Sequence, residues 1–456
     1  MVAIVTDSMK RKMAELLFDE AISTSDSHEY YLGIGKADTY DSSDATATPL
    51  RSLKEEREAR NNLQSVKKVT GTSFVIPRYN WTSGSTYSAW SDASVGIPSN
   101  SYYVMTEDNE VYVCLQQGKS ATGTINTSTV KPSYTTAGVN QVQSFRTSDG
   151  YVWKLMYSLS ASRANTFLSS GFIPCQNVTV DSSSANTFEL QQLNIQKTAT
   201  KGNIVGVEIV DGGTGYSGDS ATVTFKGNGS NALAAAKISG NTIVRVEMIN
   251  ESGGTGSGYD YASAQVTGNA VLRPIIAPRD GLGFDARSDL KSSSVMFNIK
   301  PTGDETNTFN ITNDFRQILL FRNLDETDSA QDGNRYTGTS SNAQRFLTIT
   351  GTVSASNFVV DETITGGTSG VTAFVDELDS NSGNKIFFHQ NGNNIAGDFT
   401  DGETITGSLS GSATIDSADK HSAVDNHSGE LLYIENRARV IRSSSQTEDI
   451  KVIITV

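Results

Sequence analysis

Histidine pairs are the first place to look for metal chemistry in this chain. His421 and His427 lie six residues apart with Asp425 between them, and imidazole and carboxylate groups suit zinc or iron. The segment around them is polar, and no helical HExxH pair occurs anywhere in the sequence. This pattern is more typical of a solvated connection, so we expect no metal site.

A glycine-rich segment at 212–218, GGTGYSG, contains a formal GxGxxG pattern at Gly213, Gly215 and Gly218. A dinucleotide site needs a helix directly after this motif, because the helix amino end holds the pyrophosphate. The residues that follow are strand-like, and a similar glycine turn recurs before Tyr259. The motif therefore predicts a hairpin turn with positive φ. Its faint likeness to calcium-binding repeats rests on two copies with unequal spacing, so we expect no cofactor or ion.

Other catalytic signatures are missing from the sequence. It contains no P-loop, no GxSxG nucleophile motif and no kinase motif set. Carboxylates are abundant, and a glycosidase pair among them has no sequence signature, so a hydrolase is kept as the third hypothesis. The basic run at 10–12 is more typical of a charged helix face than of a nucleic-acid site. We predict that the protein is not an enzyme and has no catalytic residues.

Composition restricts the class of protein further. The 456 residues carry a formal net charge of −14, which disfavours non-specific binding to phosphate backbones. Forty glycines and a hydrophobic fraction of 36% suit short strands, many turns and a modest core. Cys114 and Cys175 form no CxxC pair, which fits synthesis in a reducing cytoplasm, although one disulfide between them stays open. No apolar run reaches the length of a membrane span.

Two segments have helical patterns and most of the rest reads as strands. We predict helices over 7–22, where Asp7 or Ser8 serves as cap, and over 50–66. β-Branched and aromatic runs predict strands between 66 and 180, with a long polar excursion at 116–144. The segment 273–290 is predicted to be a connection, and the C-terminus to form two strands docked in a sheet.

Two internal repeats organise the chain. A unit of strand, glycine turn and strand at 202–225 recurs at 240–266, and DETITG at 361–366 recurs as GETITG at 402–407. Two copies are too few for a solenoid, so each pair is predicted to close into one small β-domain. The predicted fold is mainly β: a layered β-sandwich core, a few helices in loops and two inserted small β-domains. The predicted boundaries are 1–199 (core, with two helices), 200–270 (insert), 271–345 (core), 346–420 (insert) and 421–456 (C-terminal core strands).

Several motifs, in their order along the chain, resemble one family. They are 3–6 (AIVT), 75–78 (VIPR) with Trp81, 111–115 (VYVCL), 149–154 (DGYVWK), 315–318 (FRQI), 427–437 (HSGELLYIENR) and 446–448 (QTE). The chain resembles the baseplate wedge subunits, of the type numbered eight, of T-even-like contractile-tailed bacteriophages. The repeat at 202–266 and the stretch PIIAPRDGLGF are similar to the form found in phages of cyanobacteria.

The resemblance implies a structural component of the baseplate wedge, without catalytic residues. It implies a homodimeric connector that binds other wedge proteins and a fibre-connecting baseplate protein. The charge and the lack of a long apolar run separately predict that the protein binds neither nucleic acid nor membrane. The resemblance places the protein in the virion tail baseplate after assembly in the host cytoplasm. The candidate framework and interface residues that it points to are Arg78, Trp81, Trp153, Tyr433, Glu435 and Arg437.

One alternative comes from a different class of protein. The glycine-tyrosine and GETITG repeats carry tyrosine, aspartate and asparagine in loops, side chains that can bind sugars. This favours a receptor- or glycan-binding module of a tail fibre or adhesin as the second hypothesis.

Overall fold

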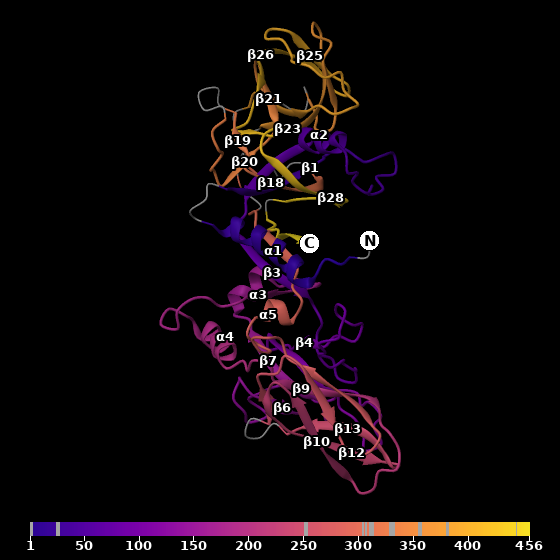
Figure 1. Cartoon of the computed structure of the whole chain (residues 1–456). Helices are drawn as coiled ribbons and strands as arrows, with labels where there is room; N and C mark the ends of the chain where they lie inside the picture. Colours follow the sequence, from indigo (N-terminus) through magenta and orange to yellow (C-terminus); the bar gives the residue numbers. More distant parts are fainter. Residues whose placement is uncertain are drawn as a thin grey trace. The chain divides into compact units, whose positions relative to one another are not determined.

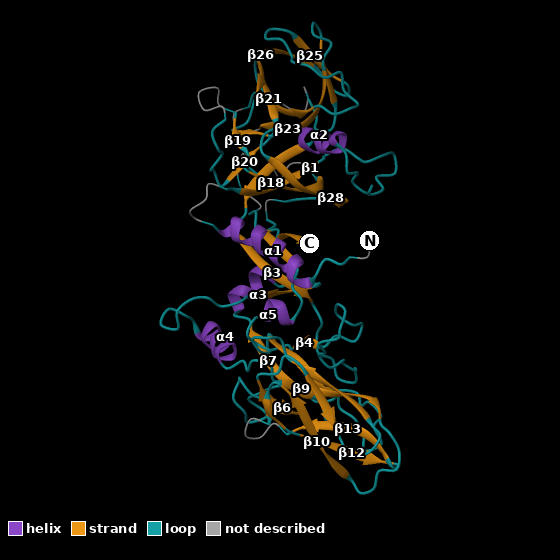
Figure 2. Ribbon diagram, in the orientation of Figure 1, coloured by secondary structure: helices purple, strands orange, loops and turns teal. Residues whose placement is uncertain are grey.

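The computed structural model describes residues 3–23, 28–249, 254–302, 305, 308–309, 314–327, 333–353, 358–379, 383–443 and 445–456. Strands dominate and helices are few (Figure 2), which confirms the prediction of a mainly β chain. The chain divides into two compact units, and Figure 1 labels the helices and strands of the whole chain. Unit 1 comprises residues 1–16, 73–296 and 454–456, and unit 2 comprises 17–72 and 297–453.

Unit 1 is built first on a four-stranded antiparallel sheet in the order β4-β5-β7-β6. Its strands are dense in aromatic and β-branched residues, which suit a pleated surface that is covered on both faces. Most side chains of β5 and β7 are buried, so both faces carry a core. The strands are β4 (Tyr103–Met105), β5 (Glu110–Gln116), β6 (Ser144–Arg146) and β7 (Val152–Ser158).

The first repeat pair of the sequence contributes to a six-stranded sheet of unit 1 in the order β13-β12-β10-β15-β16-β9. Its strands are β9 (Ile204–Asp211), β10 (Ser220–Gly227), β12 (Ala234–Ser239), β13 (Thr242–Met248), β15 (Ala262–Gln265) and β16 (Val271–Ile276). A two-stranded pair, β11 (Ser230–Ala232) and β14 (Thr255–Ser257), accompanies the sheet.

The predicted hairpin around the GxGxxG motif is wrong. β9 pairs with β16, and β10 pairs with β12 and β15, so the two strands that flank the motif are not partners. The prediction of positive φ holds at all three glycines, with φ of 65°, 81° and 78° at Gly213, Gly215 and Gly218. The motif therefore connects strands that are not partners, and the ring of Tyr216, within it, packs against Gly268 after β15, where an added Cβ would lie 2.5 Å from the tyrosine oxygen.

Unit 2 contains a five-stranded antiparallel sheet in the order β20-β2-β1-β18-β28. β1 and β18 lie in the middle, and every side chain of β1 is buried, as are all but the last of β18. The strands are β1 (Tyr30–Gly35), β2 (Leu63–Lys68), β18 (Phe315–Arg322), β20 (Ser340–Asn342) and β28 (Glu430–Val440), with a small pair β19 (Asp325–Glu326) and β27 (Val424–Asp425).

The second repeat pair forms a closed six-stranded barrel in unit 2, in the order β21-β24-β23-β22-β25-β26. In each TIT triplet the isoleucine, Ile364 or Ile405, is fully buried and the threonines face outward, as expected for strand alternation. The strands are β21 (Arg345–Ile349), β22 (Thr363–Gly366), β23 (Thr372–Asp379), β24 (Lys385–His389), β25 (Thr404–Gly407) and β26 (Ser412–Lys420).

Three strands and one helix contain residues of both units: β3 (Gly71–Pro77), β17 (Ser294–Ile299), β29 (Ile450–Thr455) and α1 (Asp7–Ile22). In unit 1, β3 pairs antiparallel with β8 (Phe172–Cys175). The helix predicted over 7–22 and the two C-terminal strands are confirmed.

The helix predicted over 50–66 is half wrong. α2 (Leu53–Asn61) ends early, and β2 begins at Leu63 because this segment is buried as a strand beside β1. Three further helices lie outside the predicted ones: α3 (Ala161–Phe167), α4 (Thr187–Lys197) and α5 (Ala286–Asp289). The segment 273–290, predicted as a connection, contains α5 and the end of β16. Among the described residues, no helix has the length and hydrophobicity needed to cross a bilayer.

Candidate interaction surface

Three of the candidate residues, Tyr433, Glu435 and Arg437, alternate along β28 and share one face of the strand. The Tyr433 hydroxyl donates to Glu435 Oε2 at 3.0 Å, and Arg437 Nε lies 3.5 Å from Glu435 Oε1. Burial and the Glu435 charge raise the pKa of Tyr433 to about 12. The candidates on this strand therefore form one row of paired polar groups, with the phenol neutral at physiological pH.

β28 lies at one end of its sheet, and within the described part of the chain it pairs with β18 alone. The register shifts opposite Leu320 and Phe321, which leaves Leu432 without a partner residue across the ladder. A bulge of this kind twists an edge strand and hinders indiscriminate pairing with other chains. The edge strand is thus irregular at Leu432, in the middle of the segment that borders the candidate row.

A groove of about 500 Å³ lies beside this strand in unit 2. Its apolar residues are strongly exposed: Leu50 by 68%, Leu53 by 75% and Leu432 by 41%. α2 fixes one wall, because the Ser52 side chain caps the helix by accepting from the Glu55 amide at 3.1 Å. The walls are formed by residues 49–53, Glu56 and residues 431–434.

Tyr40 ties the loop before this groove to the sheet, a role that no pattern in the sequence indicated. Its hydroxyl donates to the Arg316 carbonyl oxygen at 2.5 Å and accepts from the Arg437 amide at 3.1 Å. Arg316 lies on β18 and Arg437 on β28, at the second register shift between these strands. The hydroxyl therefore replaces part of the ladder that the bulge interrupts.

Arg78 and Trp81 lie in unit 1, where both are half-buried. Arg78 donates from Nη1 to the Ser169 carbonyl oxygen at 2.8 Å, and Trp81 donates from Nε1 to Ser128 Oγ at 3.0 Å. These bonds hold neighbouring loops together. The two residues are not part of the row on β28.

Trp153 also belongs to unit 1 and is fully buried. Its ring stacks on Tyr151, with centroids 5.7 Å apart and an interplanar angle of 18°, and meets the ring of Tyr87 edge to face. Such pairs add to the stabilisation gained from burial. Trp153 is thus a packing residue of the core.

The residues considered for metal binding are not gathered into a metal site. His421 and His427 are exposed and line a pocket of about 560 Å³ in unit 2 together with Asp425. Within the described ranges no three histidine, cysteine, aspartate or glutamate side chains are placed to hold a metal ion. Cys114 and Cys175 are both buried free thiols, which resolves the disulfide that the sequence left open.

Comparisons with known proteins do not assign the chain to a family. No protein-family model matches the chain, and no curated protein matches it at a significant level.

Proposed function

We propose that this chain is a structural component of the baseplate wedge of a contractile bacteriophage tail. In this role it is a homodimeric connector that binds neighbouring wedge proteins and a fibre-connecting baseplate protein, and it works by binding rather than by catalysis. The observation that carries the proposal concerns the segment 427–437, where the resemblance to the family is strongest. Most of this segment is the edge strand β28, which borders an apolar groove.

The groove offers a physical reason for association. Burying exposed leucine surface contributes about 25 cal/mol per Å² of apolar area, so Leu50, Leu53 and Leu432 favour a partner. Its rim carries both signs of charge, Arg51 and Glu56. In a twofold dimer the same patch faces itself, so each Arg51 can lie opposite the Glu56 of the other copy. A second copy of the chain is therefore the occupant we propose for this groove.

The dimer is tested by native mass spectrometry and light scattering of the full chain. We expect a dimer for the natural chain, and a dissociation constant raised at least about 100-fold by the double substitution Leu53→Asp and Leu432→Asp. Leu233→Asp is the matched control, because Leu233 is 51% exposed in unit 1 and is not part of the groove. A monomer at high concentration, or a dimer that the double substitution leaves intact, contradicts the dimer proposal.

The baseplate role needs a separate experiment. Density for this chain in an electron-microscopy map of an intact contractile tail, together with co-purification with wedge proteins, is the expected result. Phage particles that contain no copy of the chain would overturn the assembly role. Deletion of 346–420, followed by particle assembly, then separates the framework from the inserted barrel.

A further inference from the structure

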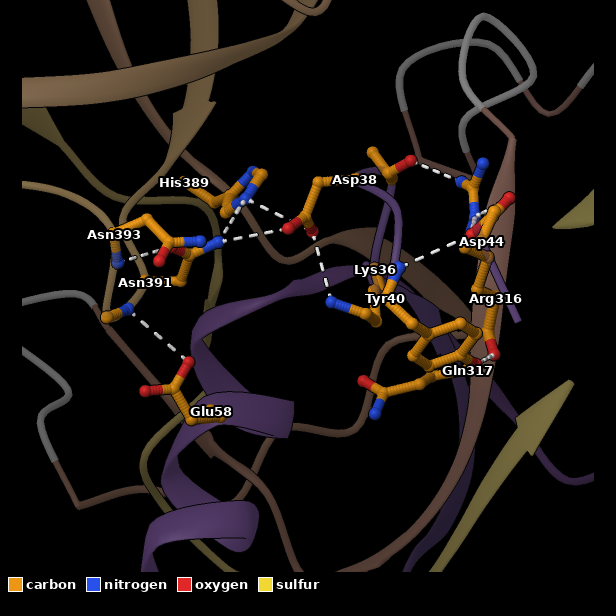
Figure 3. A network of polar contacts seen from close by, with 12 residues as sticks. Lys36, Asp38, Tyr40, Asp44, Glu58, Arg316, Gln317, His389, Asn391 and Asn393 are labelled. Carbon is orange, nitrogen blue, oxygen red and sulfur yellow. Dashed lines mark hydrogen bonds and ion pairs between the residues drawn. The ribbon is translucent and has the colours of Figure 1, made fainter. Parts of the chain in front are cut away.

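A second hollow in unit 2 has a different character from the apolar groove. It has a volume of about 430 Å³ and lies among the segment after β1, helix α2, strands β18 and β28, and the connection from β24 to β25. Figure 3 shows Asn391, Asn393 and Glu58 on one side, and Lys36, Tyr40 and Gln317 on the other. The volume falls in the usual range for small-ligand pockets, about 300–1,000 Å³.

Hydrogen bonds and ion pairs hold the walls of this polar pocket in place. Asp38 receives Lys36 Nζ at 3.4 Å and Asn391 Nδ2 at 3.4 Å, and His389 Nε2 lies 3.8 Å from it. Next to Asn391, the Gly392 amide donates to Glu58 Oε2 at 3.4 Å. Segments that are distant in the sequence are thus held in place around the pocket. A ligand that binds there therefore costs the protein less conformational entropy.

Two amide oxygens in the pocket lining have unmet hydrogen-bonding capacity. Asn62 and Gln317 are only 5% and 4% exposed, and Asn62 Oδ1 and Gln317 Oε1 have no hydrogen-bond partner among the described residues. Gln317 Nε2 donates to Asn436 Oδ1 at 2.8 Å, which fixes the orientation of its amide. A buried acceptor without a donor is costly, about 1–3 kcal/mol. The two oxygens themselves are buried from solvent, so the groups that a guest can contact are the other polar side chains of the lining.

The charges around the pocket nearly balance. Lys36 and Lys54 stand against Asp38, Glu55 and Glu58, which leaves a net formal charge of about −1. Such a lining attracts neither a strong anion nor a strong cation, and it presents donors and acceptors together. Sugar hydroxyls donate and accept at the same time, so they match this mixture.

Apolar surface at the pocket completes the match. Tyr40 and Leu50 are both in the lining, and Tyr40 is half-buried. The carbon-bound hydrogens of a sugar ring need such surface, while its hydroxyls need the amides and carboxylates. A ligand that is a simple ammonium ion or a phosphate would contact only some of these donors, acceptors and apolar groups.

We infer that the pocket lined by Asp38, Glu58, Gln317 and Asn393 binds one neutral sugar residue of a glycan. The pocket shares Leu50 and Ser52 with the groove beside β28, but the four residues named here lie outside that groove, and the site needs no second copy of the chain. It differs from the glycan hypothesis drawn from the repeats in its position. Only residues 391–393 come from the second insert, and the remainder comes from the connection between β1 and α2, from α2 with its cap Asn62, and from β18 and β28.

The test uses the full chain on an array of neutral and acidic glycans, followed by titration calorimetry with the neutral monosaccharide that binds best. Glu58→Ala and Asn393→Ala each remove one polar group from the wall, and we expect each to weaken binding at least about tenfold. Asn140→Ala is the control, because Asn140 is an exposed asparagine of unit 1. Thermal unfolding of each variant confirms that the fold is retained.

The outcomes are distinct. Binding of a neutral sugar that both pocket variants weaken and the control leaves unchanged supports the inference. No binding of any neutral sugar at about 10 mM, binding that the pocket variants leave unchanged, or binding restricted to acidic glycans overturns it. Any of these results leaves the dimer and assembly proposals standing, because they are tested on other residues.

Discussion

Glu362 and Glu403, equivalent residues of the two GETITG repeats, each close the turn of the opposite repeat. Glu403 accepts from the Ser369 amide at 2.9 Å and from Ser369 Oγ at 2.8 Å. Glu362 accepts from the Leu409 amide at 3.0 Å and from Ser410 Oγ at 2.5 Å. Both carboxylates are almost fully buried, with exposures of 1% and 5%. The two halves of the barrel are therefore interlocked by a reciprocal pair of contacts.

Replacement of either glutamate is expected to loosen the turn of the other repeat. Glu403→Ala leaves the amides of Thr368 and Ser369 without an acceptor, and Glu362→Ala does the same for Leu409. Hydrogen bonds to a charged group contribute about 1.5–3 kcal/mol each, so a local loss of about 2–4 kcal/mol is expected. Amide hydrogen exchange at the residues of each turn measures this loss of local stability.

The reciprocal contact predicts that each substitution raises amide exchange in the turn of the other repeat. Glu403→Ala should increase exchange at 368–369 more than at 409–410, and Glu362→Ala should do the reverse. Asp416→Asn, an exposed carboxylate on β26, is the control and should change neither turn. Exchange that rises only within the repeat that carries the substitution would contradict the interlock.

His389 is expected to make unit 2 less stable at alkaline pH. Burial by itself lowers the pKa of His389, but Asp376 at 2.8 Å from Nδ1 and Asp38 on the other side raise it, with a net rise. A raised pKa in the folded state means that the stabilisation is complete below about 6.5 and is lost as pH rises through the folded value. Lys36 beside Asp38 opposes the rise.

Chemical denaturation of the natural chain and of His389→Gln at pH 6 to 9 measures this effect. The natural chain should lose more stability over this range than the variant, which has no titrating group at this position. Equal pH dependence of the two proteins would show that the imidazole proton does not contribute.

Tyr40→Phe is expected to destabilise the sheet of unit 2 by about 1–3 kcal/mol. The substitution keeps the ring but removes the hydroxyl, so the Arg316 carbonyl and the Arg437 amide lose their partner at the bulge. Denaturant unfolding gives the magnitude. Tyr261→Phe is the control, since Tyr261 is 67% exposed in the other unit. Equal stability of Tyr40→Phe and the natural chain would exclude a structural role for the hydroxyl.

Both thiols are expected to resist alkylation in the folded protein. Burial raises the pKa of Cys175 to about 12 and raises that of Cys114 as well, so the reactive thiolate is scarce at neutral pH. Mass spectrometry after maleimide treatment should find no adduct in native buffer and two adducts in denaturant. Rapid labelling of the native chain, or one disulfide in place of two thiols, would contradict the buried free pair.

Local patterns in the sequence were sufficient for much of the secondary structure. Glycine-rich turns, β-branched runs and an apolar stripe at helical spacing predicted a mainly β chain and the limits of α1, since these signals act between near neighbours. α4 also had a readable signal, a capping box between Asn186 and Glu189. The helix over 50–66 failed because burial of 63–66 beside β1 outweighs helix propensity.

By itself, then, the sequence determined the β character, the first helix and the two repeats, because propensity and periodicity reside in neighbouring residues. Only the tertiary structure decided that the second repeat closes into a barrel, that β9 and β10 have other partners, and that Tyr40 reaches Arg437, 397 residues away. The polar pocket likewise joins Lys36 to Asn391 and Asn436. Such contacts depend on which surfaces pack together to exclude water, and that is a property of the whole unit rather than of any one segment.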